Sequence, residues 1–172
     1  MRKRLDAIYD AAMYLAALCM VGVLGMVLAS VVGRLFDFNL RGSDAYAGYF
    51  MAAASFLALA HTLKRGEHIR VTLILDRLGQ RRKHALEIWC HVVGTLICVV
   101  LALFSARLVW QSWSFHDVSQ GNDATPLWIP QISMAVGTAV LLLAMADDLI
   151  LYLRGHDPRP PKDALEELKL VE

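Results

Sequence analysis

The stretch AAMYLAALCMVGVLGMVLASVV, residues 11–32, decides the class of fold. It holds 22 residues, and its only ionisable side chains are Tyr14 and Cys19. A helix rises about 1.5 Å per residue, so this stretch is long enough to cross a bilayer core of about 30 Å. Three further apolar stretches of similar length follow at residues 45–63, 88–106 and 127–146. The sequence therefore predicts an all-α membrane protein with four transmembrane helices.

The composition of the whole chain agrees with a membrane protein. Of its 172 residues, 57% are hydrophobic and 19% are charged, and the mean hydropathy is +0.47. A soluble domain is about 45–50% apolar and about 25% charged. The three cysteines all lie within apolar stretches, and an odd number of such thiols does not make a disulfide framework. These features exclude a soluble enzyme, a nucleic-acid-binding protein and a secreted disulfide-rich domain.

The basic residues divide unequally between the two sides of the membrane. Fourteen Lys and Arg residues lie before the first span, between spans two and three, or after span four. The other side has three, namely Arg34, Arg41 and Arg107. Because cytoplasmic loops carry an excess of Lys and Arg, we expect both termini and the central loop to lie in the cytoplasm. We divide the chain into a membrane domain at residues 1–155 and a cytoplasmic tail at residues 156–172.

The central loop contains a second apolar pattern. Val71, Ile74, Leu75 and Leu78 recur at the spacing of one helix face. The segment is too short and too charged to cross the membrane, so we expect an amphipathic helix over about residues 68–82, lying on the cytoplasmic leaflet. A soluble helix packed on another subunit has the same pattern and is an alternative. Three basic residues where span three begins favour anionic lipid there: Arg81, Arg82 and Lys83.

Several side chains near the ends of the spans are suited to the membrane interface. Tryptophan is enriched at that level, and we expect all four tryptophans to lie there: Trp89, Trp110, Trp113 and Trp128. Asp44 is placed to cap the helix of the second span. Asp147 and Asp148 follow the fourth apolar stretch. We therefore expect them at the inner interface, facing lipid or pairing with another subunit.

Few side chains in the spans are suited to chemistry. His61 and His91 lie near the cytoplasmic ends of two different spans, and two such histidines can ligate a haem. One alternative function is therefore a haem b-binding membrane anchor subunit of a redox complex. A small multidrug exporter is a further alternative, but it needs a carboxylate in the first span, and residues 11–32 have none. We expect no catalytic, metal-binding or substrate-binding residue in this chain.

Two segments carry a resemblance to a known family. The first follows the second span and reads Gly66, Glu67, His68, Ile69, Arg70 and Val71. The second, residues 122–131, opens the fourth span and includes Thr125, Pro126, Trp128 and Pro130. With the four spans and the short basic central helix, they resemble the small membrane subunit, DctQ type, of tripartite ATP-independent periplasmic (TRAP) transporters. Thr72 stands where the family often has an acidic residue, and Asp76 lies one turn later.

The resemblance implies a scaffold subunit of an importer in the inner membrane of a bacterium. Its partners would be a large membrane subunit of the DctM type, which performs sodium-coupled symport, a periplasmic binding protein of the DctP type, and membrane lipids. The substrate would be an organic acid, such as a C4-dicarboxylate, another carboxylate or a sulfonate. The resemblance places the substrate and sodium sites in the large subunit, so no cofactor is expected in this chain.

Overall fold

The chain folds into four long helices. The computed structural model describes residues 2–38, 42–65, 80–121 and 123–154, with α1 at Arg2–Leu35, α2 at Ser43–Lys64, α4 at Gln80–Ser114 and α5 at Trp128–Leu153. Within these residues, β pairing is confined to one antiparallel bridge between Val118 and Pro126. All four helices are long and apolar enough to cross a membrane. The prediction of an all-α protein with four membrane-spanning helices is therefore confirmed.

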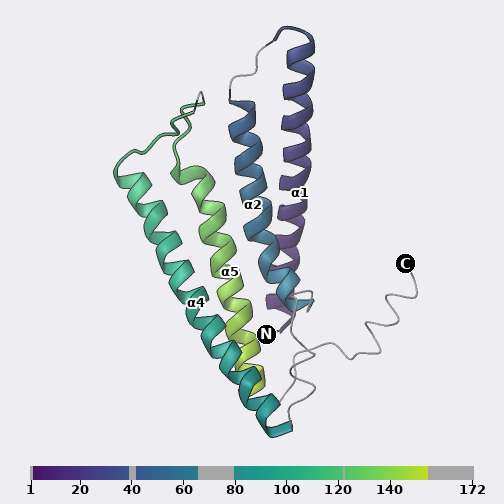
Figure 1. Cartoon of the computed structure of the whole chain (residues 1–172), viewed down its shortest axis with the longest axis vertical. Helices are drawn as coiled ribbons and strands as arrows, with labels where there is room; N and C mark the ends of the chain where they lie inside the picture. The colour runs from purple at the N-terminus through teal and green to yellow at the C-terminus, as the bar shows by residue number, and fades with distance from the viewer. Residues whose placement is uncertain (1, 39–41, 66–79, 122, 155–172) are drawn as a thin grey trace, which may run out of the picture.

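The helices lie in the spatial order α1, α2, α5, α4, which differs from their order in the chain (Figure 1). Each consecutive pair in the chain, α1 with α2 and α4 with α5, is an antiparallel hairpin, as short connections dictate. The hairpins pack through α2 and α5, which run in the same direction, and α1 and α4 flank them (Figure 1). We call the end where α1 begins the N-terminal end of the bundle, and the opposite end the loop end.

The helices extend beyond the apolar stretches that predict them. The clearest case is α4, which covers residues 80–114, whereas the apolar stretch covers residues 88–106. Polar residues continue the helix because its backbone hydrogen bonds do not depend on an apolar side chain. Residues 80–82, predicted to end the amphipathic helix, belong to α4 instead. The rest of that predicted helix, with Val71, Ile74, Leu75 and Leu78, lies outside the described residues.

The two hairpins approach closely where α5 has a glycine. A Cβ atom added to Gly137 would lie 2.5 Å from the backbone oxygen of Phe56 on α2, closer than real Cβ contacts allow. Small residues let transmembrane helices associate, because lipid chains are as apolar as the side chains and packing must supply the attraction. The alanine-rich second span is therefore a packing surface at Ala53, Ala54 and Ala60, all of which are buried.

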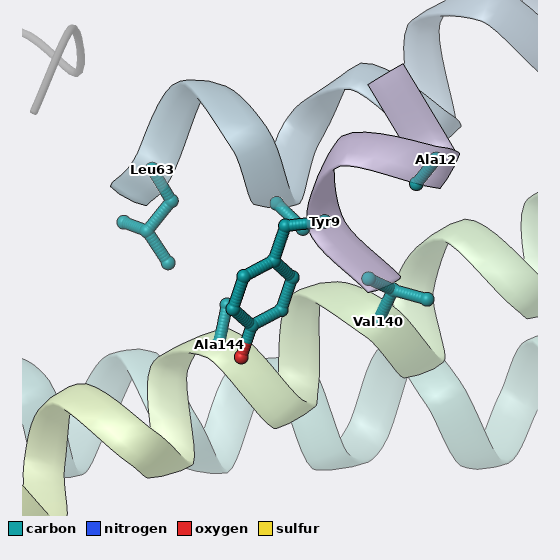
Figure 2. Close-up of a cluster of buried hydrophobic side chains, with 6 residues drawn as sticks. Tyr9, Ala12, Leu63, Val140 and Ala144 are labelled. Atoms are coloured by element: carbon teal, nitrogen blue, oxygen red, sulfur yellow. The ribbon is translucent and has the colours of Figure 1, made fainter. Parts of the chain in front are cut away.

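Three helices meet at the N-terminal end of the bundle. Tyr9 of α1 places its ring between α2 and α5, beside Leu63 and Ala144 (Figure 2). This ring is only 3% exposed, and Ala60 and Ala144 are fully buried. The helix thus begins before the apolar stretch at residues 11–32, since α1 starts at Arg2 and its first turns pack against the rest of the bundle.

Candidate functional site: a helix interface tied at both ends

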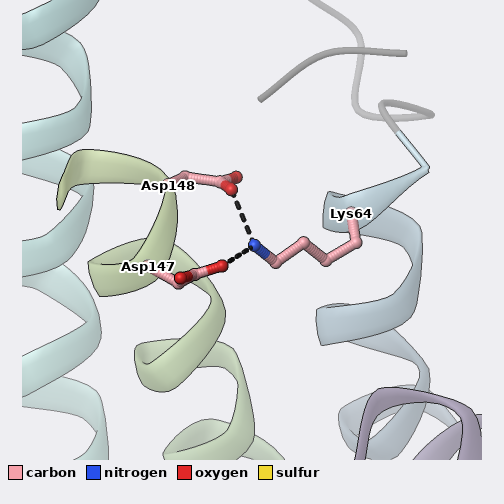
Figure 3. Close-up of polar contacts among 3 residues, drawn as sticks. All are labelled: Lys64, Asp147 and Asp148. Atoms are coloured by element: carbon pink, nitrogen blue, oxygen red, sulfur yellow. Dashed lines mark hydrogen bonds and ion pairs between the residues drawn. The ribbon is translucent and has the colours of Figure 1, made fainter. Parts of the chain in front are cut away.

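A lysine joins the two hairpins at the N-terminal end of the bundle. The Nζ atom of Lys64, the last residue of α2, lies 2.6 Å from Oδ2 of Asp147 and 2.8 Å from Oδ1 of Asp148 on α5 (Figure 3). The Asp148 side chain is 5% exposed, while those of Lys64 and Asp147 are 22% and 26% exposed. We call these three residues the lysine bridge. They form a partly buried ion triad with a net charge of −1.

The helix geometry explains why these three residues meet. Lys64 is 21 residues after Ser43, the first residue of α2, and Asp148 is 20 residues after Trp128, the first residue of α5. Because α2 and α5 run in the same direction from the loop end, nearly equal counts bring these residues to the same end of the bundle. The opposite charges therefore face each other across the interface.

The expected role of the two aspartates was wrong. They were expected to face lipid or to pair with another subunit, because they follow an apolar stretch that is already long enough to cross the membrane. Instead α5 continues to Leu153, and both carboxylates bind Lys64 of the same chain. A charge at this depth is stable only with a partner, and the lysine supplies it.

Other polar side chains surround the lysine bridge. Lys64 Nζ lies 5.4 Å from the centre of the Tyr9 ring, within the range of a cation–π interaction. His61 Nδ1 lies 3.7 Å from Oδ1 of Asp10 on α1. All three helices α1, α2 and α5 thus contribute polar contacts at this end, and these contacts fix their relative positions.

The loop end of the bundle is held by a second set of contacts, centred on Asp123. This residue belongs to the loop between α4 and α5, and its carboxylate accepts hydrogen bonds from Tyr49 Oη of α2 at 3.0 Å and Ser119 Oγ at 2.8 Å. The hydroxyl oxygens of Thr125 and Tyr46 lie 3.0 Å apart. We call Tyr46, Tyr49, Ser119, Asp123 and Thr125 the Asp123 cluster. It ties the α4–α5 loop to the first two turns of α2.

The Asp123 cluster also shifts the acidity of its carboxyl group. Desolvation raises the pKa of Asp123, but the hydrogen bonds donated by Ser119, Thr125 and Tyr49 together lower this pKa by more than desolvation raises it. The pKa therefore lies below the ordinary carboxyl value. Asp123 is therefore a carboxylate at neutral pH, as three hydroxyl donors require.

The two loops touch each other beside this cluster. Gly42, which precedes α2, has a φ of +83°, a conformation that favours glycine. A Cβ atom at this position would lie 2.7 Å from Cβ of Asp123. Gly42 is also the N-cap of α2, so the prediction that Asp44 caps this helix is wrong. Asp44 instead lies 3.8 Å from Arg34 of α1.

The described part of the second family-like segment lies at this site. Thr125 belongs to the Asp123 cluster, Pro126 forms the single bridge with Val118, and the carbonyl of Pro130 accepts a hydrogen bond from Ser133 in the first turns of α5. Trp128 packs edge-on against Trp113, with ring centres 4.9 Å apart. The first family-like segment, with Gly66, Glu67, His68, Ile69 and Arg70, lies outside the described residues.

The structure gives positions for several of the remaining residues that were predicted to lie at the membrane interface. Trp110 and Trp113 near the end of α4 and Trp89 near its beginning are exposed, so each can contact lipid. Arg82 is also exposed, in the first turn of α4. The side chains of Arg81 and Lys83 lie outside the described residues. A role for these side chains in lipid contact stays a prediction.

The two histidines proposed as haem ligands have separate contacts. His91 of α4 is buried, its Nδ1 lies 2.8 Å from the carbonyl oxygen of Glu87, and its ring packs on Tyr152 of α5. His61 instead faces Asp10 of α1. No group of three or more His, Cys, Asp or Glu residues that could hold a metal ion occurs in the described part of the chain.

Most residues of the lysine bridge and the Asp123 cluster were not predicted to hold the helices together. Tyr46 and Tyr49 give no signal, because a tyrosine near the end of an apolar stretch is ordinary in a membrane protein. Lys64 did have a signal, since its depth along the second span matches that of Asp147 and Asp148 along the fourth. This signal becomes usable once the two spans are known to be neighbours.

The architecture defines a multi-pass membrane protein whose central helix pair is tied at both ends. Residues 23–155, more than three quarters of the chain, match the family described as Tripartite ATP-independent periplasmic transporters, DctQ component. The chain belongs to this family, the small membrane component of TRAP transporters, and the resemblance found in the sequence is confirmed. A search of curated protein sequences finds no significant match.

The family decides between the alternative functions. It is a transporter component rather than an enzyme, and it functions in a tripartite complex with a large membrane subunit and a periplasmic binding protein. Neither the family nor the positions of His61 and His91 support a haem-binding anchor subunit.

Proposed function

We propose that this chain is the fixed scaffold of a TRAP importer for an organic acid. The large DctM-type subunit moves the substrate together with sodium, and a DctP-type periplasmic protein delivers it. The substrate is a C4-dicarboxylate or a related carboxylate or sulfonate. The observation that carries the proposal is the α2–α5 interface, which the lysine bridge ties at one end and the Asp123 cluster at the other.

An interface tied in this way resists the motions that transport requires. Alternating access needs one group of helices to move against another around a substrate site near the bilayer midplane. Sliding or tilting α2 against α5 would break the ion triad at one end and the Tyr49–Asp123 hydrogen bond at the other. Close packing at Gly137 opposes the same motion between the two ends. The chain therefore suits the part of a transporter that stays still.

Reconstitution tests this function. The purified chain is placed in liposomes with a sodium gradient and candidate organic acids, with and without the large subunit and the binding protein. We expect saturable, sodium-dependent uptake only when all three components are present. Saturable uptake by the small chain alone would contradict the scaffold proposal, as would full uptake by the other two components without it.

We also propose that the N-terminal end of the bundle faces the cytoplasm of a bacterial cell and that the protein lies in the inner membrane. The proposal is supported by Lys64, Arg65, Arg82 and Arg154, which all belong to helix ends at the N-terminal end of the bundle (Figure 1). In a cysteine-free background, a cysteine at Gln120 should react with a membrane-impermeant maleimide in intact cells, whereas one at Arg82 should not. The reverse pattern would overturn this orientation.

A further inference from the structure

A groove runs along α4 on the half of the bundle nearer the loop end. It has a volume of about 500 Å³. Its apolar wall consists of Leu101, Phe104 and Leu108 of α4 with Met134 of α5, and Ser105, Arg107 and Gln111 add polar groups. Leu101, Phe104 and Leu108 recur at the spacing of one helix face, so the groove follows the helix axis.

The groove changes from apolar to polar along its length. From Leu101 to Gln111 the helix rises roughly 15 Å, and Arg107 and Gln111 lie on the side nearer the loop end. Met134 is six residues after the start of α5, and Leu108 is six residues before the end of α4, so the two walls are at equal depth. A ligand that fits this gradient has a polar head near the membrane surface and an apolar chain that points toward the bilayer centre.

Arg107 supplies a positive charge without a partner of its own. It is exposed, and no carboxylate in the described ranges pairs with it. Arg34, another basic residue toward the loop end, pairs with Asp44 instead. Arg107 lies seven residues before the end of α4, roughly 10 Å from that end along the helix axis. From this depth an arginine side chain extends toward the headgroups and binds an anion there.

We propose that this groove binds one phospholipid from the leaflet at the loop end. The guanidinium group of Arg107 and the amide of Gln111 donate hydrogen bonds to the lipid phosphate, and one acyl chain lies over Leu101, Phe104, Leu108 and Met134. A partner helix would need its own anion at this depth, which is costly in a membrane, whereas the bilayer supplies a phosphate there in every phospholipid. The charge and the apolar gradient of the groove therefore favour a lipid.

Lipid retention by the purified full-length chain tests the proposal. Native mass spectrometry in detergent, with phosphatidylglycerol or phosphatidylethanolamine added, should show one tightly held lipid per chain. Arg107→Gln should weaken its binding by about tenfold, as expected for the loss of a charged hydrogen bond. Arg107→Lys should retain most of the affinity for either lipid, because the cation remains. Leu108→Trp fills the exposed groove and should reduce binding of both lipids to a similar extent.

A matched control separates the groove from general surface charge. Arg34→Gln removes the same charge toward the same end of the bundle but lies away from the groove, so lipid binding should not change. Equal retention by the wild type and Arg107→Gln would overturn the proposal. A photo-crosslinking amino acid at Leu108 in the assembled transporter should capture phospholipid. Capture of the large subunit at that position would instead show that a protein helix occupies the groove.

Discussion

The two ends of the α2–α5 interface are held by different chemistry. At the N-terminal end, Lys64 bridges two carboxylates, one of which is buried, whereas at the loop end a half-buried aspartate accepts hydrogen bonds from neutral hydroxyl groups. A buried charge that loses its partner is strongly destabilising, while a charge that water still reaches is partly resolvated. The lysine bridge should therefore set the stability of the bundle, and the Asp123 cluster should set the local order of the loop.

Breaking the lysine bridge should have the largest effect. Lys64→Met leaves Asp147 and Asp148 without their cation and should destabilise the fold by about 3 kcal/mol, toward the low end for a broken buried pair because Lys64 is partly exposed. Thermal unfolding in detergent measures the loss. Combining Lys64→Met with Asp147→Asn and Asp148→Asn removes the unpaired charges and should restore much of the stability. An unchanged unfolding temperature in Lys64→Met would show that the bridge contributes nothing.

Overpacking the middle of the α2–α5 interface should have the next largest effect on stability. Gly137→Ala introduces a Cβ atom into the backbone of Phe56 and should cost about 1–3 kcal/mol through overpacking. Gly48→Ala is the matched control, because a Cβ atom at Gly48 meets no atom within 4 Å. The control should be as stable as the wild type in the same unfolding assay. Equal losses in both variants would mean that helix propensity, and not packing between the hairpins, decides the outcome.

Weakening the Asp123 cluster should change the loop more than the bundle. Tyr49→Phe removes the hydroxyl that joins α2 to Asp123 and leaves the ring in place. The unfolding temperature should fall less than in either variant above, while proteolysis within residues 115–127 should become faster. Tyr14→Phe is a suitable control, since Tyr14 is exposed on α1 and far from this loop in the chain. A fall as large as that of Lys64→Met would contradict the contrast between the two ends.

Acid should produce the smallest effect at the loop end, through Asp123. The pKa of Asp123 is lowered in the folded protein, so its contribution to stability is present above the unfolded value of 3.8 and is lost as the pH falls through the lower folded value. The loop should therefore remain ordered through the neutral and mildly acidic range. Asp123→Asn should lack this acid transition. The fluorescence of Trp128, in a background without the other tryptophans, follows the loop; a transition near neutral pH would contradict the assignment to Asp123.

The number and type of the helices could be predicted from the sequence, but not their ends. An apolar stretch of about 20 residues is a strong signal because the bilayer core sets its length. The ends of α4 at Gln80 and Ser114 carry no such signal, since polar residues there continue the helix into the interface. The same limit led to the wrong expectation for Asp147, which was placed after the fourth span although α5 continues beyond it.

The candidate site likewise has one part that could be predicted from the sequence and one part that could not. The family could be recognised from the order of spans and from residues such as Thr125 and Pro126, because these are properties of the chain itself. The partners that Lys64 and Asp123 have on other helices could not be predicted, because each lies 74 or more residues away in the sequence, at Tyr49 or at Asp147 and Asp148.

The sequence by itself determined that this protein has four membrane spans, an uneven distribution of basic residues and a transporter family. These follow from local hydrophobicity, charge and short motifs, each of which acts within one segment. Only the tertiary structure decided that α2 lies beside α5 and not beside α4, the next helix along the chain. All four spans are apolar enough to pack on any of the others in lipid, so the choice of neighbour depends on shape and buried charge, at Gly137 and at Lys64, where two distant segments must fit each other.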